Sequence, residues 1–589
     1  MINIKKGDKF VLMNKILKFL TIGIIFIFFL SSFSNSSTNI SAKMVYENLN
    51  NDSFDGYILY TPEYSKMSYL INNNEEILQM WKSDYIQGMS VYLLDNGDIL
   101  RSDLPFTSPT FWGGGITGRV EKFSWNGSLL WEFEYSNEVY CLHHDIEILP
   151  NGNILMTAWE YKTRDEAIEA GRNPNYLMFN YLWPDFIIEV EPTEPFGGNI
   201  VWEWHVWDHL IQDFDPSKDN FGNVSNHPEL ININYPQIPV PGDWNHINSI
   251  DYNKEFDQIL LSVRGFSEIW VIDHSTTIEE STGHTGGRYG KGGDLLYRWG
   301  NPRVYYAGNK SDQKLFDQHD ARWIEKNYPG QGNILVFSNG NTRPEPKYSS
   351  VDEIEPPVDI NGFYYLEPGL PYGPEEQVWI YTAENPPDFF ASHISGAQRL
   401  YNGNTLICNG PSGTFFEVTP NKETIWQYEN PFPNLVTNDV FTIQHYPPGN
   451  PEIGANLDCE GLLKWTEIKA GEIANGYFQV QNIGDSDSLL NWEIEFLPNW
   501  GTWSINPSSG INLTPEDGVV TVEVSVVSPN KKNEEFIGSI RIKNIDNSTD
   551  WEIIPVYLKT LRNRATNFNP FLNLLDRFQI LKKIFYLYF

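Results

Sequence analysis

The chain has 589 residues, 41% of them hydrophobic and 15% aromatic, so it is long enough for more than one domain with its own core. The aromatic content is typical of all-β proteins, in which large flat side chains pack on pleated sheets. A formal net charge of −35 argues against nucleic acid and anionic membrane surfaces as main partners, because phosphate binding needs Lys and Arg.

The N-terminal segment has the pattern of a secretory signal. Five lysines within residues 5–18 precede the run FLTIGIIFIFFL (residues 19–30), and Ser- and Asn-rich residues follow. A basic region, a short apolar run and small polar residues indicate export. The run is short for a membrane-spanning helix, although an uncleaved anchor stays open. We therefore predict a signal peptide or N-terminal anchor in residues 1–42 and an extracellular or cell-surface protein.

The number of cysteines limits the disulfides and metal sites that the chain can form. Only Cys141, Cys408 and Cys459 are present, and this low, odd number excludes a disulfide scaffold and a Cys-rich metal site. One pair could bridge, but the sequence does not say which. Cys141 and Cys408 lie in strand-like runs, where buried free thiols are equally expected.

A short unit recurs through the middle of the chain, as VYLLDNGDILRS, IEILPNGNILMT and AQRLYNGNTLICNG. Asn-Gly between alternating apolar runs predicts a β-hairpin. A second hairpin follows most copies and ends in a strand with an aromatic pair, as in VEKFSWNGSLLWEFEY. Two hairpins make a four-stranded antiparallel unit, and repeated units indicate a propeller. We predict a six-bladed β-propeller over residues 45–450, whose last blade is completed by a strand near residues 57–72.

The pattern changes after the repeats. Alternating strands separated by turn clusters predict an Ig-like β-sandwich over residues 455–560, without a catalytic constellation. The predicted fold class is thus all-β, a six-bladed propeller followed by an Ig-like sandwich. Residues 561–589 have apolar residues at near-helical spacing, interrupted by basic ones. This amphipathic tail could dock on the protein or attach it to a membrane or cell surface.

Four of the 11 histidines share a place in the repeat. His144 and His246 each stand seven residues before the Asn of the following turn, and His319 lies at the corresponding strand start. His393 comes two residues earlier, which keeps the same strand face. The first strand of each propeller blade lines the central channel, so these side chains are expected to converge at one mouth. A single histidine here is more often a hydrogen-bonded strand-end residue, but four in a common phase favour a cluster.

Two arginines indicate the chemistry of this cluster. Histidines could bind a metal ion, or act as nucleophile, acid and base near neutral pH. Arg343 in FSNGNTRPEP and Arg264 in LLSVRG are expected near the mouth, although either could be a salt-bridge partner in a loop. A guanidinium group repels a metal cation and holds an oxyanion. We therefore predict no metal in this site and an anionic substrate.

Several motifs stand around these residues, namely HHDIEILPNGNIL, WEWHVWDHLIQD, DWNHINSIDYN, QHDARW with GNILVFSNGNTR, and SGAQRLYNGNTLI. In these motifs the chain resembles the arylsulfate sulfotransferase family, over roughly residues 57–450. The resemblance implies an exported six-bladed propeller that moves a sulfuryl group from a phenolic sulfate ester to a phenol through a sulfohistidine. It implies no nucleotide sulfate donor and no cofactor. Some relatives carry a closely spaced disulfide, and no such pair is visible here.

By motif, the resemblance places His246, His319 and Arg343 at the family's sulfate-binding and acid–base positions. His393 is the candidate nucleophile and His319 the fallback, because Ser395 occupies the strict repeat position.

Three further residues are expected to bind the substrate: His144, Arg264 and His209. His209 lies in WEWHVWDHL, an aromatic segment that could stack a phenol or could be core packing.

Three other readings stay open. A non-catalytic secreted propeller would bind a carbohydrate or a protein and would tolerate loss of the histidines. A quinone-dependent dehydrogenase would need a calcium site and tryptophan docking motifs, which we do not find. A metal–histidine enzyme is disfavoured by the arginines. The sequence does not identify donor, acceptor or oligomeric state.

Overall fold

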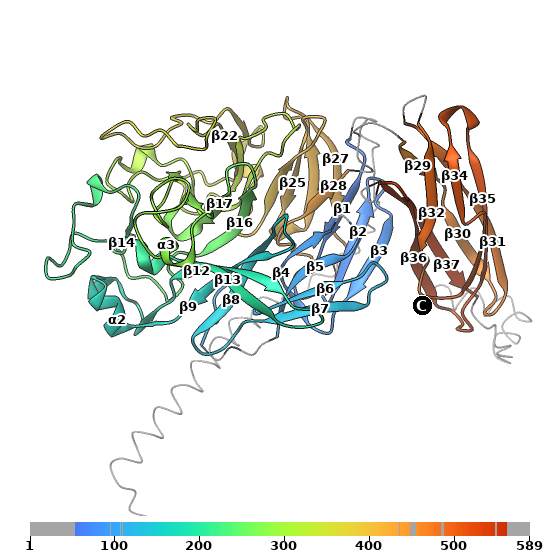
Figure 1. The fold of residues 1–589 in the computed structure, drawn as a ribbon, viewed down its shortest axis with the longest axis horizontal. Coiled ribbons are helices and arrows are strands. Elements are labelled where there is room, and N and C mark those ends of the chain that lie inside the picture. The colour runs from blue at the N-terminus through green and yellow to red at the C-terminus, as the bar shows by residue number, and fades with distance from the viewer. Residues whose placement is uncertain are drawn as a thin grey trace, which may run out of the picture. The chain divides into compact units, whose positions relative to one another are not determined.

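The computed structural model describes residues 53–561, apart from residues 95, 106–107, 109, 435, 448–454, 485–487 and 548–549. The predicted signal segment, residues 1–42, and all but the first residue of the predicted tail, residues 561–589, lie outside this part. Among the helices of the described part, none is both long and apolar enough to cross a membrane. The regular secondary structure of the described residues is almost all β-strand (Figure 1).

The strands up to β28 form six four-stranded antiparallel sheets within the described residues. In strand order from the first-named edge, the sheets are β28 (Gln444–Tyr446), β1 (Tyr57–Tyr60), β2 (Met67–Asn72) and β3 (Ile77–Lys82); β4 (Ile86–Leu93), β5 (Ile99–Leu104), β6 (Arg119–Phe123) and β7 (Leu129–Glu134); β8 (Tyr140–Ile148), β9 (Ile154–Glu160), β12 (Asp185–Pro192) and β13 (Gly198–His205); β16 (Ile247–Asn253), β17 (Gln258–Val263), β18 (Glu268–Asp273) and β19 (Tyr297–Trp299); β20 (Gln318–Trp323), β21 (Ile334–Ser338), β22 (Ser350–Ile354) and β23 (Trp379–Tyr381); β24 (Gly396–Arg399), β25 (Thr405–Asn409), β26 (Thr414–Val418) and β27 (Thr424–Glu429).

The first strand of each sheet lies next to the first strand of the following sheet, and the last sheet in the series lies next to the first. β4 contacts β8, β8 contacts β16, β16 contacts β20 and β20 contacts β24. Gln398 of β24 hydrogen-bonds His445 of β28, and Tyr446 of β28 accepts from the Leu93 amide of β4. The N-terminal strand β1 pairs with β28, which joins the two ends of the repeat in one sheet as the sequence predicts. These first strands therefore surround a common centre.

The Asn-Gly hairpins have the backbone that their sequence requires. In the copy at Asn151 the Gly152 amide donates to the Leu149 carbonyl oxygen at 2.9 Å, and Gly152 has φ +87°. Only the glycine of the Asn-Gly pair has a positive φ. The turn is therefore the three-residue form with a left-handed glycine, and not the two-residue form with two left-handed residues.

Aromatic side chains of the outer strands fill the space between neighbouring sheets. Trp131 and Phe133 alternate on β7, and their rings stack with centroids 6.1 Å apart. Both belong to a cluster that also holds Met156 and Ile188 of the next sheet. A buried Trp or Phe contributes about 3–5 kcal/mol relative to Ala, so these pairs hold adjacent sheets together.

The C-terminal strands form two sheets of their own, which share one hydrophobic cluster. Trp492 and Phe478 lie at its centre, 1% and 0% exposed, one from each sheet. In strand order the sheets are β29 (Leu457–Glu460), β31 (Ile473–Asn482), β35 (Val520–Val527) and β33 (Thr502–Asn506); and β30 (Leu463–Ile468), β37 (Trp551–Thr560), β36 (Glu535–Asn544), β32 (Leu490–Phe496) and β34 (Ser509–Leu513).

The remaining elements are short connections. They are the helices α2 (Arg164–Glu169) and α3 (Ile278–Ser281), the paired strands β10 (Lys162–Thr163) with β11 (Tyr181–Leu182) and β14 (Leu210–Ile211) with β15 (Ile231–Asn232), and the 3₁₀ turns η1 (Pro174–Tyr176), η2 (Val206–His209), η3 (Val224–Asn226), η4 (Arg264–Phe266), η5 (Lys310–Asp312), η6 (Pro386–Asp388), η7 (Gly410–Ser412) and η8 (Pro515–Asp517).

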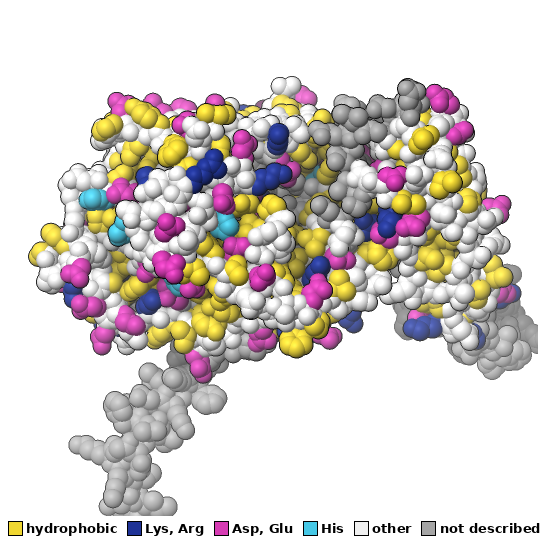
Figure 2. Space-filling view, viewed as in Figure 1, with side chains coloured by type: hydrophobic (Ala, Val, Ile, Leu, Met, Phe, Trp, Pro, Cys, Tyr) yellow, Lys and Arg dark blue, Asp and Glu magenta, His cyan; other side chains and the backbone are white. Residues whose placement is uncertain are grey.

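The surface and the cysteines agree with the composition. Figure 2 shows acidic side chains scattered over the visible face, as a net charge of −35 requires. The three cysteines carry free thiols. Burial raises the pKa of Cys141 to about 11, so that thiol is protonated and unreactive at neutral pH.

Candidate active site

Three histidines from three sheets meet where the first strands begin. The His144 and His246 rings are 4.5 Å apart in an edge-on arrangement, and the His144 and His319 rings are 6.5 Å apart. Phe441 lies beside these rings, and its ring centroid is 4.8 Å from that of His319. We call His144, His246 and His319 the histidine cluster.

The backbone that presents these side chains departs from a regular strand. His144 and His246 have φ of +50° and +56°, in the left-handed region. The register of β8 against β9 shifts between Leu142 and Ile146, and that of β16 against β17 between Ile247 and Ser249. A bulge with a left-handed residue re-aims one side chain at a cost of about 1–3 kcal/mol. The common phase of His144 and His246 in the sequence is therefore the phase of a repeated bulge, whereas in β20 the left-handed residue is Asp320, next to His319.

Hydrogen bonds fix the orientation of the rings. His246 Nδ1 lies 2.5 Å from Asp243 Oδ2. His319 Nδ1 donates to the Ser395 carbonyl oxygen at 2.8 Å, so its Nε2 carries the lone pair. That Nε2 is buried and has no hydrogen-bond partner among the described residues. The cluster thus holds an acid–base pair and one buried lone pair without a partner.

Burial keeps His144 and His319 uncharged. It lowers the pKa of His319 to about 3 and that of His144 well below its ordinary value. The other histidines and Arg264 add to both effects, because a second positive charge beside them is unfavourable. Burial alone would raise the pKa of Asp243, but His246 keeps it lowered, so this carboxylate is ionised. The neutral imidazoles of His144 and His319 thus stand beside His246, whose partner Asp243 is an anion.

Arg264 acts on this cluster electrostatically, because its positive charge lowers the pKa of His144 and that of His319. Its side chain is 37% exposed, and its closest carboxylate is Asp317 at 3.9 Å. The amide of Thr342 donates to the same carboxylate at 2.9 Å. Asn341 donates to the carbonyl oxygen of Ser392. The segments that carry Arg343 and His393 are therefore tied to Arg264 along one rim.

His393 and Arg343 lie on this rim and outside the buried cluster. His393 is exposed, and its Nδ1 is 2.8 Å from the Ser392 hydroxyl. Its pKa is lowered by partial burial and by the charge of Arg264, against the opposing effect of Asp439. Electrostatically it also lowers the pKa of His319, so it stands in the same neighbourhood.

The guanidinium group of Arg343 has mostly aromatic and hydroxyl neighbours. It lies 4.1 Å from the ring centroid of Tyr348 and 4.6 Å from that of Phe316. It donates to the Tyr348 hydroxyl at 3.2 Å and to the Ser350 hydroxyl at 3.0 Å. Stacking of this kind fixes an arginine without neutralising its charge.

His209 lies elsewhere. It ends η2 and contacts Asp294, His284 and Trp204, none of which belongs to the cluster or the rim. Of the seven site residues expected from the sequence, the structure brings His144, His246 and His319 together, sets Arg264, Arg343 and His393 around them, and leaves His209 apart.

Several neighbours of the cluster were not singled out from the sequence. His143 Nδ1 lies 2.9 Å from His144 Nδ1, and its ring stacks on Trp159 at 4.2 Å. Trp159 leads through Trp183 to Trp112, whose side chain is 61% exposed. His143 belongs to the HHD motif and Trp112 to the WGGG segment of residues 112–115, whereas Trp159 and Trp183 lie elsewhere in the chain. Only the tertiary contacts reveal that these residues form one aromatic row.

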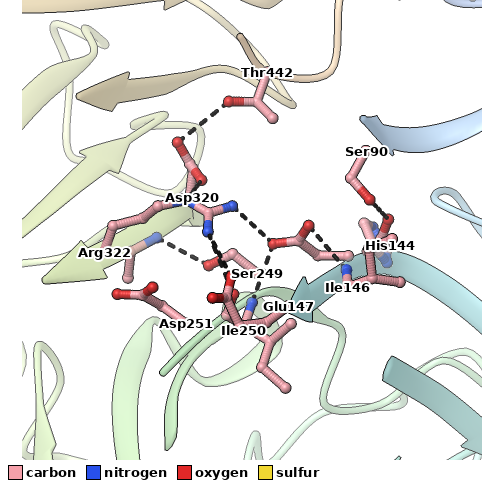
Figure 3. A network of polar contacts seen from close by, with 12 residues as sticks. Ser90, His144, Ile146, Glu147, Ser249, Ile250, Asp251, Asp320, Arg322 and Thr442 are labelled. Atoms are coloured by element: carbon pink, nitrogen blue, oxygen red, sulfur yellow. Dashed lines mark hydrogen bonds and ion pairs between the residues drawn. The ribbon is translucent and has the colours of Figure 1, made fainter. Parts of the chain in front are cut away.

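A charged network fills the centre of the ring beyond the cluster (Figure 3). Arg322 of β20 donates to Asp145 of β8 at 3.0 Å and to the Tyr92 hydroxyl of β4 at 2.6 Å. It also bonds Asp320 at 2.9 Å and lies 3.6 Å from Glu147. Since β4 and β20 stand on opposite sides of the ring, this guanidinium group spans its interior.

A cavity of about 1330 Å³ opens at the other ends of the same strands. It is lined by residues where β4, β8, β16 and β20 finish, including Leu93, Ile148, Asn253 and Trp323. No histidine is among its lining residues. The candidate site is therefore distinct from this cavity.

Comparison with known proteins gives a family. Residues 63–460 match the family model described as arylsulfotransferase (ASST). A curated relative, the arylsulfate sulfotransferase AssT of Escherichia coli O6:H1 (strain CFT073), is 26% identical over 316 residues, which cover 47% of this chain and 46% of the relative. The chain thus spans about half the length of that relative.

Solved structures show weaker likeness. A protein of unknown function from Bacteroides caccae is 13% identical, with 66% of this chain and 98% of that chain covered and a TM-score of 0.37. Virginiamycin B lyase from Staphylococcus aureus is 11% identical, with 68% and 97% covered and a TM-score of 0.32.

Proposed function

Because this chain belongs to the arylsulfotransferase (ASST) family, we propose that it moves a sulfuryl group from a phenolic sulfate ester to a phenolic acceptor, without a nucleotide sulfate donor. In this proposal the six four-stranded sheets are the blades of a β-propeller, and the histidine cluster lies at one mouth of its channel. The observation that carries the proposal is the histidine cluster, in which His144 and His319 are neutral, beside Arg264, which no carboxylate approaches closer than 3.9 Å among the described residues.

His393 is the proposed nucleophile. It is exposed on the rim, whereas Nε2 of His319 is sealed from solvent. The lowered pKa of His393 keeps its ring neutral, and a neutral imidazole has the lone pair that a nucleophile needs. Because Nδ1 faces the Ser392 hydroxyl, Nε2 is the atom left to attack.

The reaction proceeds in two balanced steps. First, His393 Nε2 forms a bond to sulfur while the bond from sulfur to the aryl oxygen breaks, and the leaving phenolate takes a proton from His246. Then the acceptor oxygen forms a bond to sulfur, the sulfur–nitrogen bond breaks, and the acceptor's proton passes to His246. His246 is therefore an imidazolium before the first step and again after the second, and Asp243 stabilises that form.

Cations on the rim hold the sulfuryl oxygens. Arg264 is the principal donor, because its charge is only loosely balanced by Asp317. Arg343 is the second, fixed between two aromatic rings. Negative charge spreads over the oxygens in the transition state, so preorganised cations supply much of the catalysis.

We further propose that the protein is exported, with residues 1–42 as its signal or anchor. The two C-terminal sheets are proposed to form an Ig-like sandwich that acts as a spacer. Phenolic sulfate donors and phenol acceptors are the proposed small-molecule partners.

The test uses 4-nitrophenyl sulfate. Nitrophenolate release by the purified protein is followed with and without added phenol, and the intact mass of donor-treated protein is measured for a covalent sulfuryl adduct. We expect phenol-dependent release and an adduct that His393→Ala abolishes. His227→Ala is the matched control, because its side chain is 48% exposed and paired with Glu229 outside the site.

Two results would change the proposal. An adduct that persists in His393→Ala and disappears in His319→Ala would move the nucleophile to His319. No release across a panel of aryl sulfates and acceptors would refute the transferase and favour a binding protein.

A further inference from the structure

A second group of convergent side chains lies away from the histidine cluster, around the end of η2. Nδ1 of His209 is 2.9 Å from Asp294 Oδ1, and Nδ1 of His284 is 2.8 Å from the same oxygen. One ligand atom from each of these three residues lies within 4.8 Å of the other two. Among the described residues this is the group with the spacing that a metal ion requires.

The hydrogen bonds of His209 leave one lone pair without a neutral partner. Its Nε2 is 2.9 Å from the carbonyl oxygen of Ser281, which can only accept, so Nε2 carries the hydrogen. In a neutral ring Nδ1 then has a lone pair, and it faces a carboxylate oxygen that also has only lone pairs. Two such atoms at 2.9 Å need a shared positive centre, either a proton between them or a metal ion that bonds to both from one side.

The bond to Ser281 is also the usual support of a metal-binding imidazole. Metal-ligating histidines generally donate their other nitrogen to a carbonyl or carboxylate, which fixes the tautomer and aims the lone pair. The ring of Trp204 stacks on that of His209 at 5.6 Å with an interplanar angle of 8°, and its indole donates to the Gly293 carbonyl oxygen at 2.7 Å. The imidazole is thus held in plane from two directions.

The loop that brings His284 and Asp294 to His209 is built to pass over that ring. A Cβ at Gly293 would lie 2.6 Å from His209 Nε2 and 2.0 Å from the Ser281 oxygen. Only glycine leaves room for this approach. The adjacent helix α3 is capped by Thr277 through a capping box, which fixes the Ser281 carbonyl at its other end.

The burial of the three residues suits an ion with one open position. His209 is 0% exposed and the Asp294 side chain 7%, whereas the His284 side chain is 59% exposed. The charges around the group are mixed: Asp208 faces His209, and Lys291 faces Asp294. Two protein nitrogens and one carboxylate oxygen, with water on the exposed side, form a donor set that zinc accepts.

We propose that His209, His284 and Asp294 bind one divalent transition-metal ion of the zinc type. The ion links η2 to the loop of residues 282–294 and has no part in the proposed sulfuryl transfer. The ion takes the place of the proton that His209 and Asp294 would otherwise share. It also explains why the exposed His284 lies beside a buried carboxylate.

The experiment uses the full-length mature protein, free of any histidine tag. Zinc binding is measured by titration calorimetry after chelator treatment, and Co²⁺ is added separately as a spectroscopic probe of nitrogen–oxygen ligation. We expect one equivalent of zinc, a visible Co²⁺ spectrum, and a rise in the midpoint of thermal unfolding on adding zinc. The variants His284→Ala and Asp294→Asn should each weaken zinc binding at least about tenfold, since loss of an outer support alone costs that much.

Controls separate this site from the many surface carboxylates. His227→Ala removes an exposed histidine with one carboxylate neighbour, Glu229, and should bind zinc as the unaltered protein does. His284→Ala should keep its 4-nitrophenyl sulfate activity, so a failure of either proposal leaves the other standing. Zinc binding equal in the unaltered protein and His284→Ala, or no saturable binding, would refute the site and assign the group to an imidazolium–carboxylate pair.

Discussion

His319 donates from Nδ1 to the carbonyl oxygen of Ser395 at 2.8 Å, across two neighbouring sheets. The bond decides which nitrogen of a buried imidazole is free. It also ties the start of β20 to the segment that carries His393, two residues before Ser395. A backbone oxygen therefore sets both the tautomer of one histidine and the place of another.

The neutral state of His319 predicts a pH-dependent stability. Its pKa is lowered to about 3 in the folded protein and is ordinary, 6.5, in the unfolded chain. Between these values the unfolded chain binds more protons, so the free energy of unfolding falls as pH decreases from 6.5 towards 3, by on the order of 1.4 kcal/mol per pH unit at most.

The matched variant for this effect is His319→Asn, whose amide can still donate to Ser395. Denaturant unfolding is measured from pH 4 to pH 8 for both proteins. We expect their difference in free energy to change with pH below about 6.5 and to level off above it. A difference that stays constant through this range would contradict a buried neutral imidazole.

Asp243→Asn tests the proposed acid–base role of His246. The substitution keeps the shape but removes the charge that stabilises imidazolium. We expect the release of phenol from phenyl sulfate in the first turnover to slow by about 10²–10⁴, and the first-turnover release of nitrophenolate from 4-nitrophenyl sulfate to slow far less, because nitrophenolate leaves without a proton. Equal losses with the two esters would instead indicate that Asp243 only supports the fold.

Trp112→Ala tests whether the exposed end of the aromatic row binds the acceptor. A stacked ring contributes about 0.5–1.5 kcal/mol, so the KM for phenolic acceptors should rise roughly twofold to tenfold with little change in kcat. Trp112→Phe should recover most of the loss. Phe196→Ala is the control, because Phe196 is also highly exposed, at 69%, and lies in a turn outside the site. Equal effects of the two alanine variants would contradict an acceptor surface.

Arg322→Met tests the network at the centre of the ring. Removing the guanidinium group leaves Asp145 and Asp320 without their shared cation in a buried place. Loss of one member of a buried ion pair costs about 3–5 kcal/mol, which urea unfolding measures directly. Arg288→Met, at an exposed position, should change stability by less than about 0.5 kcal/mol. A similar small change for Arg322→Met would show that the network does not stabilise the fold.

Local sequence signals carried most of the information on the sheets. Alternating apolar residues and Asn-Gly turns mark hairpins whose partners are close in the chain, such as β8 and β9. They also located the histidines, because the bulge that presents His144 recurs at the same step of the repeat in His246.

Contacts between sheets could not be read in this way. His209 has the same residue type and aromatic context as a site residue, yet its partner Asp294 lies 85 positions away. Arg343 follows the expected strand, but its guanidinium group stacks on Phe316 and Tyr348, and no periodicity specifies a rotamer. The offset of His393 has a backbone cause, since Ser395 takes the left-handed place in the repeat, with φ +85°.

Because Arg322 and its carboxylates span the interior of the ring, the rim is the one approach to the histidine cluster that the proposed reaction uses. The phenol released from the donor must then leave by the path along which the acceptor arrives. Each phenol that departs is itself an acceptor, so the exchange runs in both directions, and the relative acidity of the two phenols sets the final balance. The sulfate ester of a strongly acidic phenol is therefore a good donor, and the phenol that it releases is a poor acceptor in the reverse reaction.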